Sequence, residues 1–572
     1  MDRNLVLAIG LSIVIIVVFQ YFFQSFSPQP GKKGPETTER AKETKPALAP
    51  KAQDAEQSRP DEHRTPTATA EAAPAESAQS ADDGVKDVRV TVDGLKYRAV
   101  ISSVGARIVS FELKDYRENL KGKTLVNLFP SDAPDTSGPS VILTGRDERF
   151  NDSALRYQYD SSDTSFHLLE KGAKKSITLK ARMKGGITIE KTYVFSSDSY
   201  SVGFSLALTN TSHEPRNYLI TFPWKKYFDQ NSGERFAWDS AEILLDGNLK
   251  DYYFSKIHGD EEPSGKVAWA GLGSVYFFKA LVFGETPAAK VTLFKPSKDG
   301  VAEIKVRYGG VDLQPGKRVD ADMSLYLGPK ERQALNAAGR DLSRALFYSE
   351  YTILEVMAEY LMKFLRFCNS GLTISGLKIP GTHNYGLDII LLTIVIKILF
   401  IPLTHKSMKS MKKMQDLQPE IAKLKERYKD DKQAMNKAMM ELFKQYKVSP
   451  LSGCWPMFVQ LPVFIALYQA LSYAIELRQA PFVCVPSIYL CINDLSAPDP
   501  YYVTPILMGG TMVLQQWMTP SAGDPMQKKM MLIMPVVFTY MFLSFPSGLV
   551  LYWLVSNLLG IGQQVLTNRM AR

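Results

Sequence analysis

Long uninterrupted runs of apolar residues occur near the N-terminus and again beyond residue 385, while the chain between them is polar or alternating. A helix needs about 20 mostly apolar residues to cross a bilayer. The run at 531–567 is too long for one span, and Phe545–Gly548 (FPSG) breaks it into two. The pattern therefore predicts six spans, one within residues 1–26 and a core of five at about 385–404, 452–475, 501–518, 531–545 and 547–567.

The N-terminal run is predicted to be an uncleaved span. Residues 5–23 exceed the apolar core of a signal peptide, which has about 7–15 residues, and no small-residue cleavage pattern follows them. Residues 27–85 are rich in Pro, Ala, Glu, Lys, Ser and Thr and contain no aromatic residue. Such a segment buries too little apolar surface to offset the entropy cost of ordering it. We expect a flexible, disordered tether at 27–85.

Apolar and polar residues alternate from about Val88, which predicts β-strands. The stretches VRVTV and LKYRAVIS flank Asp93-Gly94 and give a strong hairpin signal, and Gly185-Gly186 separates a second pair of stretches. Alternation and turn signals continue to about residue 330. We predict a large antiparallel β-sandwich domain at 86–340, on the extracytoplasmic side of the membrane.

A helical period replaces the alternation at Asp341–Cys368. An apolar stripe comprises Leu354, Met357, Leu361, Phe364, Leu365 and Cys368, and the opposite face carries Glu355, Glu359, Lys363 and Arg366. Two interpretations are open: a helix that lies in the membrane interface, or an ordinary amphipathic helix packed on the β domain. Residues 370–383 are predicted to be a connector, so that 341–383 forms one unit between the two domains.

Residues 406–450 are predicted to form a helical hairpin. Apolar residues follow a heptad spacing from Met414 to Tyr428 and again from Met435 to Tyr446. Pro419 is expected to kink or restart the first arm. Twelve Lys and Arg residues lie in this segment, which favours a cytoplasmic location. The parity of the spans then puts both termini in the cytoplasm and the β domain outside.

The first core span carries a positive charge. Lys397 lies well inside Leu387–Leu403, and Asp388 lies near one end. A charge at this depth costs about 3 kcal/mol on insertion scales and usually faces the protein interior or a water-filled cavity. We therefore expect a functional charge inside a membrane bundle. The alternative is a lysine that reaches to the interface or pairs with Glu476 or Asp388.

Other polar side chains accompany this lysine. Thr393 lies one helical turn before Lys397, on the same face. Amides and polar-tipped aromatic rings occur in the other spans at Gln460, Tyr552, Trp553 and Asn557. Each of them alone is typical of contacts between helices. Because polar groups at membrane depth need partners or water, the set together indicates a hydrophilic groove.

Composition narrows the class of protein. The net charge of +9 fits either nucleic acid or basic loops beside anionic lipid, and with these spans we expect the lipid bilayer and no DNA. The basic hairpin is open to two interpretations, a solvated coiled coil or a contact surface for lipid headgroups, ribosomal RNA or a protein. Four cysteines are too few for a disulfide framework, although Cys484 and Cys491 share one loop and could be bridged if it is extracytoplasmic. No metal, cofactor or catalytic residue is predicted.

Several motifs resemble those of bacterial YidC-type membrane protein insertases of the Gram-negative kind, which carry a large periplasmic domain. The motifs include KILFIPLT at Lys397–Thr404, QLPVF at Gln460–Phe464, ELRQAPF at Glu476–Phe482, DLSAPDPYY at Asp494–Tyr502 and FPSGLVLYWLVSN at Phe545–Asn557. The resemblance is dense over residues 384–568, and the layout of the rest of the chain agrees with it. We identify the chain as a member of that family on the combination of motifs.

The resemblance implies insertion and folding of inner-membrane proteins, alone or with the Sec translocon. Partners would be nascent membrane proteins and, at the cytoplasmic hairpin, the ribosome or a signal-recognition receptor. It implies a groove whose positive residue attracts acidic segments. That residue is usually arginine and is Lys397 here. Thr393, Gln460, Tyr552 and Trp553 match positions implicated in substrate contact, although relatives often have tyrosine at Trp553. The connector 370–383 and the loop 483–492 look longer than usual.

Two other classes of protein compete with this interpretation. A secondary transporter or channel for a small anion, with Lys397 as its site, would show an inverted repeat among the spans, and the first and last pairs of core spans share no pattern. An envelope enzyme with a catalytic β domain would carry clustered acid and base residues in 86–330, and no such motif is identifiable there.

Overall fold

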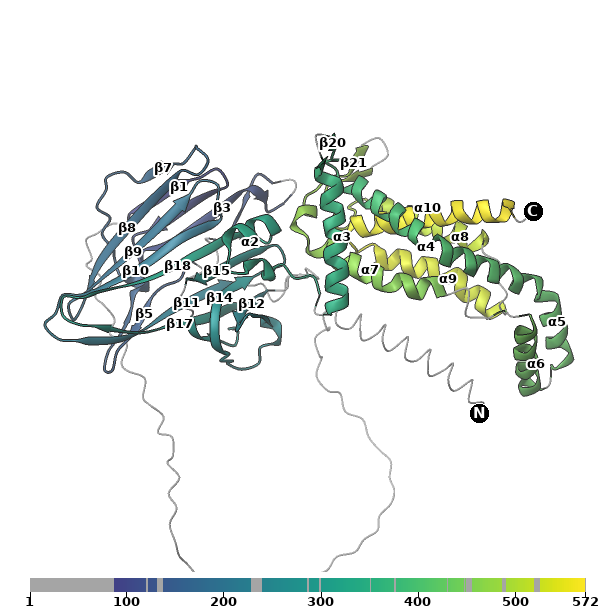
Figure 1. Cartoon of the computed structure of the whole chain (residues 1–572), viewed down its shortest axis with the longest axis horizontal. Coiled ribbons are helices and arrows are strands. Elements are labelled where there is room, and N and C mark those ends of the chain that lie inside the picture. Colours follow the sequence, from purple (N-terminus) through teal and green to yellow (C-terminus); the bar gives the residue numbers. More distant parts are fainter. Residues whose placement is uncertain are drawn as a thin grey trace, which may run out of the picture.

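A computed structural model describes the larger part of the chain. The described residues are 87–119, 122–130, 137–227, 239–284, 288–297, 300–349, 351–374, 377–429, 431–446, 448, 455–485, 490–518 and 525–570. Figure 1 shows a β domain on one side, a group of long helices on the other, and helix α3 (Thr352–Ser370) between them. The predicted N-terminal span and the tether at 27–85 lie outside the described residues.

The described residues of the β domain form two sheets. The smaller has the order β4-β3-β2-β1-β7 and consists of β1 (Arg89–Asp93), β2 (Tyr97–Ser102), β3 (Arg107–Arg117), β4 (Leu125–Asn127) and β7 (Ser165–His167). The larger has 13 strands, of which eleven follow the order β6-β5-β11-β17-β16-β14-β15-β18-β10-β9-β8, while β12 pairs with β13 and β14.

The strands of the larger sheet vary from three to thirteen residues. They are β5 (Ile142–Thr144), β6 (Arg149–Asn151), β8 (Lys174–Met183), β9 (Ile187–Ser196), β10 (Ser201–Asn210), β11 (Arg216–Tyr227), β12 (Ser240–Leu245), β13 (Asn248–Tyr253), β14 (Ser264–Gly273), β15 (Phe277–Phe283), β16 (Ala288–Leu293), β17 (Val301–Leu313) and β18 (Arg318–Pro329). Short 3-10 helices η1 (Asp152–Ala154) and η2 (Phe254–Lys256) lie between strands.

The two hairpins predicted from sequence are present. Strands β1 and β2 pair in an antiparallel register across Asp93-Gly94, and β8 and β9 pair across Gly185-Gly186. The expectation of a purely antiparallel domain is wrong in one place, because β7 pairs with β1 in parallel. Strand β7 is only three residues long and reaches β1 from a distant part of the chain, so local alternation could not reveal its direction.

The space between the two sheets is filled by alternating side chains of both. The largest buried side chains include Trp224, Trp269 and Tyr193. A buried lysine also links the layers: Lys191 of β9 pairs with Asp152 of η1 at 2.5 Å and donates a hydrogen bond to the carbonyl of Gly105, between β2 and β3 of the smaller sheet. The domain therefore has its own core.

The segment between the β domain and the long helices begins with short elements. These are α2 (Arg332–Ala338) and η3 (Leu342–Ala345), followed by α3. The helix predicted to start at Asp341 starts at Thr352, because Asp341 has a left-handed backbone (φ 55°) and Leu346 is extended. The predicted connector is also more ordered than expected, with β19 (Gly371–Ile374) and β20 (Leu377–Pro380) forming a hairpin.

Five helices correspond to the five predicted core spans. They are α4 (Tyr385–Asp416), α7 (Trp455–Tyr473), α8 (Val503–Met518), α9 (Pro525–Phe542) and α10 (Ser547–Met570). The interruption predicted at Phe545–Gly548 separates α9 from α10. Within the described residues, α4 and the part of α10 at Ser547–Thr567 are long and apolar enough to cross a membrane, while Phe458–Tyr473 and Ile533–Phe542 are shorter apolar helices.

A second hairpin lies between α7 and α8. The 3-10 helix η4 (Ile475–Leu477) follows α7, and β21 (Val483–Val485) then pairs with β22 (Leu490–Ile492). Figure 1 shows β20 and β21 near one another, at the end of α3 from which α4 departs. Three- and four-residue strands are too short for their alternation to be recognised in the sequence, which is why both hairpins were missed.

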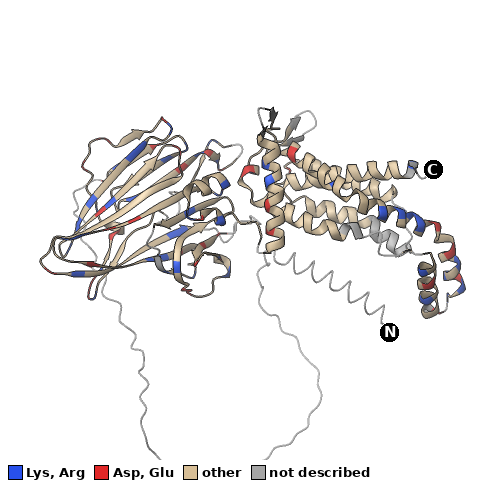
Figure 2. Ribbon diagram, viewed as in Figure 1, with Lys and Arg blue, Asp and Glu red and all other residues tan. Residues whose placement is uncertain are grey.

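The helical hairpin differs from its prediction at the start. Helix α4 continues through Pro402 as far as Asp416, so that Met414 belongs to it and not to a separate arm. The two arms are α5 (Gln418–Arg427) and α6 (Lys432–Gln445), and Pro419 lies in the first turn of α5, where proline is tolerated. Leu417, Ile421 and Val448 form a small core between them. Figure 2 shows Lys and Arg collected on the end of α4 and on this hairpin.

Candidate functional site

Lys397 projects from the middle of α4 and is half-buried. Its neighbours Ile398 and Leu399 are exposed, whereas Ile396 is buried against the other helices. A charged group at the border between the packed and exposed sides of an apolar helix is costly unless a polar partner or water meets it. The surroundings of Lys397 therefore decide what this residue can do.

Both carboxylates that the sequence offered as partners of Lys397 are engaged elsewhere. Asp388 is fully buried and accepts hydrogen bonds from the Asn369 side-chain amide (3.0 Å) and the Thr382 hydroxyl (2.5 Å). Glu476 accepts a hydrogen bond of 2.7 Å from Arg366. No ion pair or hydrogen bond of Lys397 to another residue occurs within the described part of the chain. The structure therefore does not support the alternative in which Lys397 pairs with Glu476 or Asp388.

The ammonium faces a glycine on the last helix. A β-carbon placed on Gly560 of α10 would lie 3.9 Å from Nζ of Lys397 and 3.0 Å from Nε2 of Gln515, which belongs to α8. Because Gly560 has no side chain, a cation and an amide from two other helices approach its backbone. The sequence signal for this site was a glycine inside an apolar helix, which often marks a close approach, and the sequence reasoning did not use it.

Thr393 lies one turn before Lys397, as predicted, but its hydroxyl is not free. The side chain is fully buried, and Oγ1 donates a hydrogen bond of 2.6 Å to the carbonyl of Ile389 in the same helix. Such bonds to the preceding turn are common for threonine in apolar helices. Thr393 therefore contributes a small buried side chain beneath Lys397.

Gln460 and Tyr552 meet across α7 and α10. The Gln460 amide donates a hydrogen bond to the Tyr552 hydroxyl, and the Tyr552 ring is almost fully buried. The neighbouring Trp553 packs instead into an aromatic cluster, with its ring centroid 5.0 Å from Phe464 and 5.3 Å from Phe542. This pair and this cluster connect α7, α9 and α10.

Asn557 joins α10 to α8. Its amide donates a hydrogen bond of 3.2 Å to the Thr511 hydroxyl, and the side chain is 8% exposed. Nearer the end of α10, Gln563 donates to the Thr404 hydroxyl of α4 at 2.8 Å. The six predicted groove residues therefore divide into separate contacts, and no hydrogen bond among the described residues joins Lys397 to any of the other five. Asn557 acts as a tie between helices.

The end of the helical group nearest α3 contacts α3 and the β domain. Arg366 of α3 bonds to Glu476 and, at 3.1 Å, to the Tyr348 hydroxyl. The Tyr276 hydroxyl of the β14–β15 turn donates 3.0 Å to the carbonyl of Ser472 in α7, and the Arg478 guanidinium lies over the Tyr276 ring. These contacts fix where the β domain sits on the helices.

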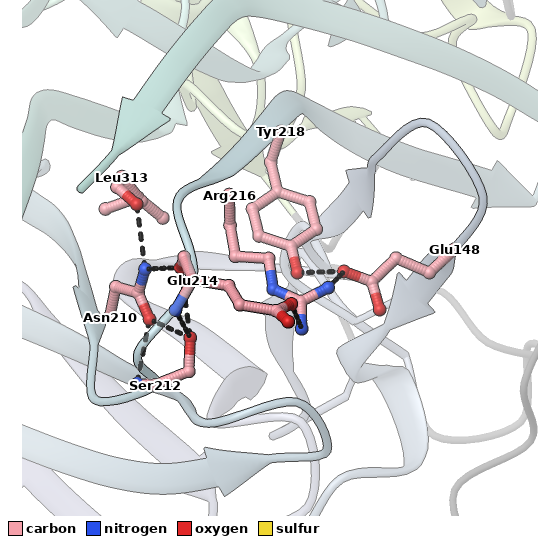
Figure 3. Close-up of polar contacts among 7 residues, drawn as sticks. All are labelled: Glu148, Asn210, Ser212, Glu214, Arg216, Tyr218 and Leu313. Carbon is pink, nitrogen blue, oxygen red and sulfur yellow. Dashed lines mark hydrogen bonds and ion pairs between the residues drawn. The ribbon is translucent and has the colours of Figure 1, made fainter. Parts of the chain in front are cut away.

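Acid and base residues of the β domain form structural contacts. In Figure 3 the Tyr218 hydroxyl and the Arg216 guanidinium both donate to Glu148, which lies in the β5–β6 turn. Burial, with the bond to Glu148, raises the pKa of the Tyr218 phenol. Asn210 donates 2.8 Å to the carbonyl of Leu313 and so pins the β10–β11 turn. These contacts join the β5–β6 and β10–β11 turns to the strands, while Nε of Arg216 is buried without a hydrogen-bond partner among the described residues.

A polar cavity of about 150 Å³ lies at the edge of the β domain. Its lining includes Arg107, Arg149, Lys225, Lys305 and Glu303. Sites for small organic ligands usually have about 300–1,000 Å³. This cavity is therefore too small for such a ligand, and we assign it none.

The chain matches known proteins over nearly its whole length. Residues 89–364 match the family described as YidC periplasmic domain, and residues 378–572 match the family described as 60Kd inner membrane protein. It is 36% identical over 575 residues to the "Membrane protein insertase YidC" of Geotalea daltonii, covering 100% of this chain and 99% of the relative. It is 37% identical over 583 residues to the protein of the same name from Syntrophus aciditrophicus, with 100% of both covered.

A solved structure described as an active YidC insertase with its first transmembrane domain resolved is also similar. It is 15% identical, with a TM-score of 0.36, and the match covers 84% of this chain and 92% of that one.

Proposed function

The chain belongs to the YidC family of membrane protein insertases, and from this premise we propose how Lys397 takes part in insertion. As an insertase of the inner membrane, the protein acts on nascent membrane proteins and is not an enzyme. The small-anion transporter is not favoured. What the family name leaves open is which residues of this chain receive the client.

The observation that supports a role for Lys397 is its position opposite Gly560 with no carboxylate partner among the described residues. An unpaired cation at membrane depth attracts an acidic side chain more strongly than it would in water, because the dielectric constant there is lower. We infer that an acidic residue of a client's translocated segment passes close to Lys397 and Gln515. The attraction offsets part of the cost of removing that residue from water.

Lysine supplies a point charge and three hydrogen-bond donors on a flexible chain, whereas arginine presents a planar fork to a carboxylate. The proposed step needs only attraction. We therefore expect Lys397 to act as a mobile cation that follows the passing carboxylate, with no fixed two-bond geometry.

The topology we propose has six spans, formed by the N-terminal run and helices α4, α7, α8, α9 and α10. The helical hairpin at 406–450 and both termini would be cytoplasmic, and the β domain periplasmic. Its support is the basic charge of the hairpin together with the arrangement in Figure 1, where the hairpin and the β domain lie at opposite ends of the long helices. The proposed units are 1–26, 27–85, 86–340, 341–383 and 384–568.

Helix α3 is proposed to lie in the periplasmic membrane interface. Its predicted apolar stripe packs inward, since Leu354, Leu361 and Leu365 contact the core. The charged face is largely engaged, as Glu359 pairs with Arg332. A second apolar stripe is exposed and suits a lipid interface. It comprises Ile353, Val356, Tyr360 and Phe367.

Further partners are proposed from charge and family. The basic hairpin α5–α6 offers a surface for the ribosome or a signal-recognition receptor, and the insertase core would work alone or beside the Sec translocon. With no nucleotide involved in the proposed step, the driving force is partitioning of the client's apolar span into lipid, together with the membrane potential.

Reconstitution tests the proposal. The purified protein is placed in liposomes with a single-span client whose short outer tail is acidic, and protection of the tail from protease is measured. We expect protection with the wild type and with Lys397→Arg and a clear loss with Lys397→Ala. Equal protection with all three would leave the insertase in place and refute the role of Lys397.

A further inference from the structure

The β21–β22 hairpin brings two cysteines opposite each other. Cys484 and Cys491 are direct partners in the antiparallel register, flanked by Val483↔Ile492 and Val485↔Leu490. Directly opposed residues of antiparallel strands have Cα atoms about 4.5–5.5 Å apart, which lies inside the range of about 4.4–6.8 Å found for disulfides. We propose that Cys484 and Cys491 form a disulfide that closes this hairpin on the periplasmic side. The inference comes from the backbone register, and it relies on the proposed topology only for the side of the membrane.

The hairpin lies on the same side as the β domain. Just before it, the Gln479 amide donates a hydrogen bond of 2.7 Å to the carbonyl of Arg117 at the end of β3. Arg478 donates to the carbonyl of the next residue, Glu118, at 3.3 Å. The β domain matches a family described as periplasmic. Disulfides form and persist in the periplasm, whereas thiols stay reduced in the cytosol.

The bond would hold the two ends of the α7–α8 connector together where they enter the helical group. The Phe482 ring packs directly on Gly386 and leaves no room for a β-carbon there. The carbonyl of Phe482 accepts 3.0 Å from the Asn384 amide, which also caps α4. At the other end Ile492 is buried. A fixed spacing between Phe482 and Ile492 keeps the Phe482 ring packed against the first turn of α4.

Formation of the bond is an oxidation that needs an acceptor. A thiolate of one cysteine attacks a disulfide of a periplasmic thiol oxidant and forms a mixed disulfide. The second thiolate then displaces that partner. The two cysteines together lose two protons and two electrons, one S–S bond forms between them, and the oxidant's disulfide becomes a dithiol.

The remaining cysteines provide internal controls. Cys368 on α3 is a free thiol in this structure. Cys454 lies outside the described residues, in the segment before α7 that we propose to be cytoplasmic. Since the chain has four cysteines, the bridged protein would carry two free thiols.

Thiol counting tests the proposal with the full-length protein, purified without reductant and unfolded in denaturant with its free thiols unblocked. A maleimide of high mass is added in denaturant, and adducts are counted on a gel. We expect two adducts before reduction and four after it, since the chain has four cysteines. Cys484→Ser should give three in both conditions. The matched variant Cys368→Ser should give one before and three after.

Four adducts without reductant would overturn the proposal, and so would a Cys368→Ser variant whose count no longer depends on reductant. Chymotryptic cleavage after Tyr489 gives a second readout, because the two halves of the loop stay joined only if the bond exists. Neither readout depends on insertion activity, so failure here is distinct from failure of the role of Lys397.

The effect of the disulfide on the α7–α8 connector has its own test. In the folded protein we expect tryptic cleavage after Arg478 to accelerate about tenfold on reduction, equivalent to ~1.4 kcal/mol of local opening free energy. The double variant Cys484→Ser with Cys491→Ser should be cleaved at the faster rate without reductant. An unchanged rate in both cases would show that the bond does not fix the connector.

Discussion

The ammonium of Lys397 lies 3.9 Å from the point where a β-carbon would stand on Gly560. The two residues belong to α4 and α10, which among the described residues are the helices long and apolar enough to cross a membrane. The absence of a side chain at Gly560 leaves space beside the α10 backbone, which the Lys397 ammonium and the Gln515 amide approach. The proposed encounter between Lys397 and a client carboxylate needs this space.

Filling the space should impair insertion. Forcing a larger side chain into a packed site costs ~1–3 kcal/mol, so we expect Gly560→Leu to lower the insertion rate of an acidic-tailed client by about tenfold. Gly562 is the matched control, since a β-carbon there meets nothing within 4 Å. Gly562→Leu should insert the client at the wild-type rate in the liposome assay. Equal loss in both variants would point to general damage of α10.

The ion pair between Arg366 and Glu476 should hold α3 on the helical group. Their side chains are 22% and 14% exposed, so this pair is intermediate between a surface ion pair and a buried one. We expect Arg366→Gln to cost about 2 kcal/mol, intermediate between the values for exposed and buried pairs. Hydrogen exchange of the α3 amides should then accelerate ~30-fold.

Lys363→Gln is the control for that measurement. Lys363 forms an exposed i,i+4 pair with Glu359 on the same helix, and such pairs contribute ~0.3–0.5 kcal/mol. Its loss should change the exchange rates of α3 little. If Arg366→Gln and Lys363→Gln gave the same acceleration, the ion pair with Glu476 would not be what holds the helix.

The β domain should lose stability as pH rises from 4.5 to about 7. Glu242 is almost fully buried and bonded to Lys330 at 2.6 Å, and burial raises its pKa from 4.5 to about 7. In that window the folded chain keeps a proton that the unfolded chain has lost, so the free energy of unfolding falls with pH, by about 3 kcal/mol at most.

The side chain of Glu242→Gln cannot ionise, so the free energy of unfolding of this variant should not show this fall with pH. Urea unfolding followed by tryptophan fluorescence at several pH values between 4.5 and 7 measures it, since Trp224 and Trp269 are buried in this domain. The exposed Glu261 provides the control. A slope that survives in Glu242→Gln, or disappears in Glu261→Gln, would contradict the assignment to Glu242.

Local sequence signals predicted the elements that depend on local chemistry. The glycine-containing turns at Asp93-Gly94 and Gly185-Gly186 produced hairpins, and the FPSG break at Phe545–Gly548 separated two helices, because turn geometry and helix interruption are properties of a few adjacent residues. Heptad spacing also predicted part of the seam of the helical hairpin, including Leu417 and Ile421, whereas Tyr446 is exposed.

Features that depend on distant parts of the chain were not predictable in the same way. The parallel pairing of β7 with β1 joins residues far apart in sequence. The inward packing of the α3 stripe depends on which helices lie beside it. Lys397 could be singled out because a charge in an apolar run is conspicuous, whereas Gly560 is conspicuous only once Lys397 and Gln515 are seen to approach it.

A charge exchange between protein and client tests the role of Lys397 most directly. Insertion into liposomes is measured for the wild type and Lys397→Glu, each with a client whose outer tail is acidic and with the same client carrying lysines instead. We predict that Lys397→Glu inserts the acidic tail poorly and inserts the basic tail better than the wild type does. Equal losses for both clients would contradict attraction by Lys397 and would leave it a structural residue.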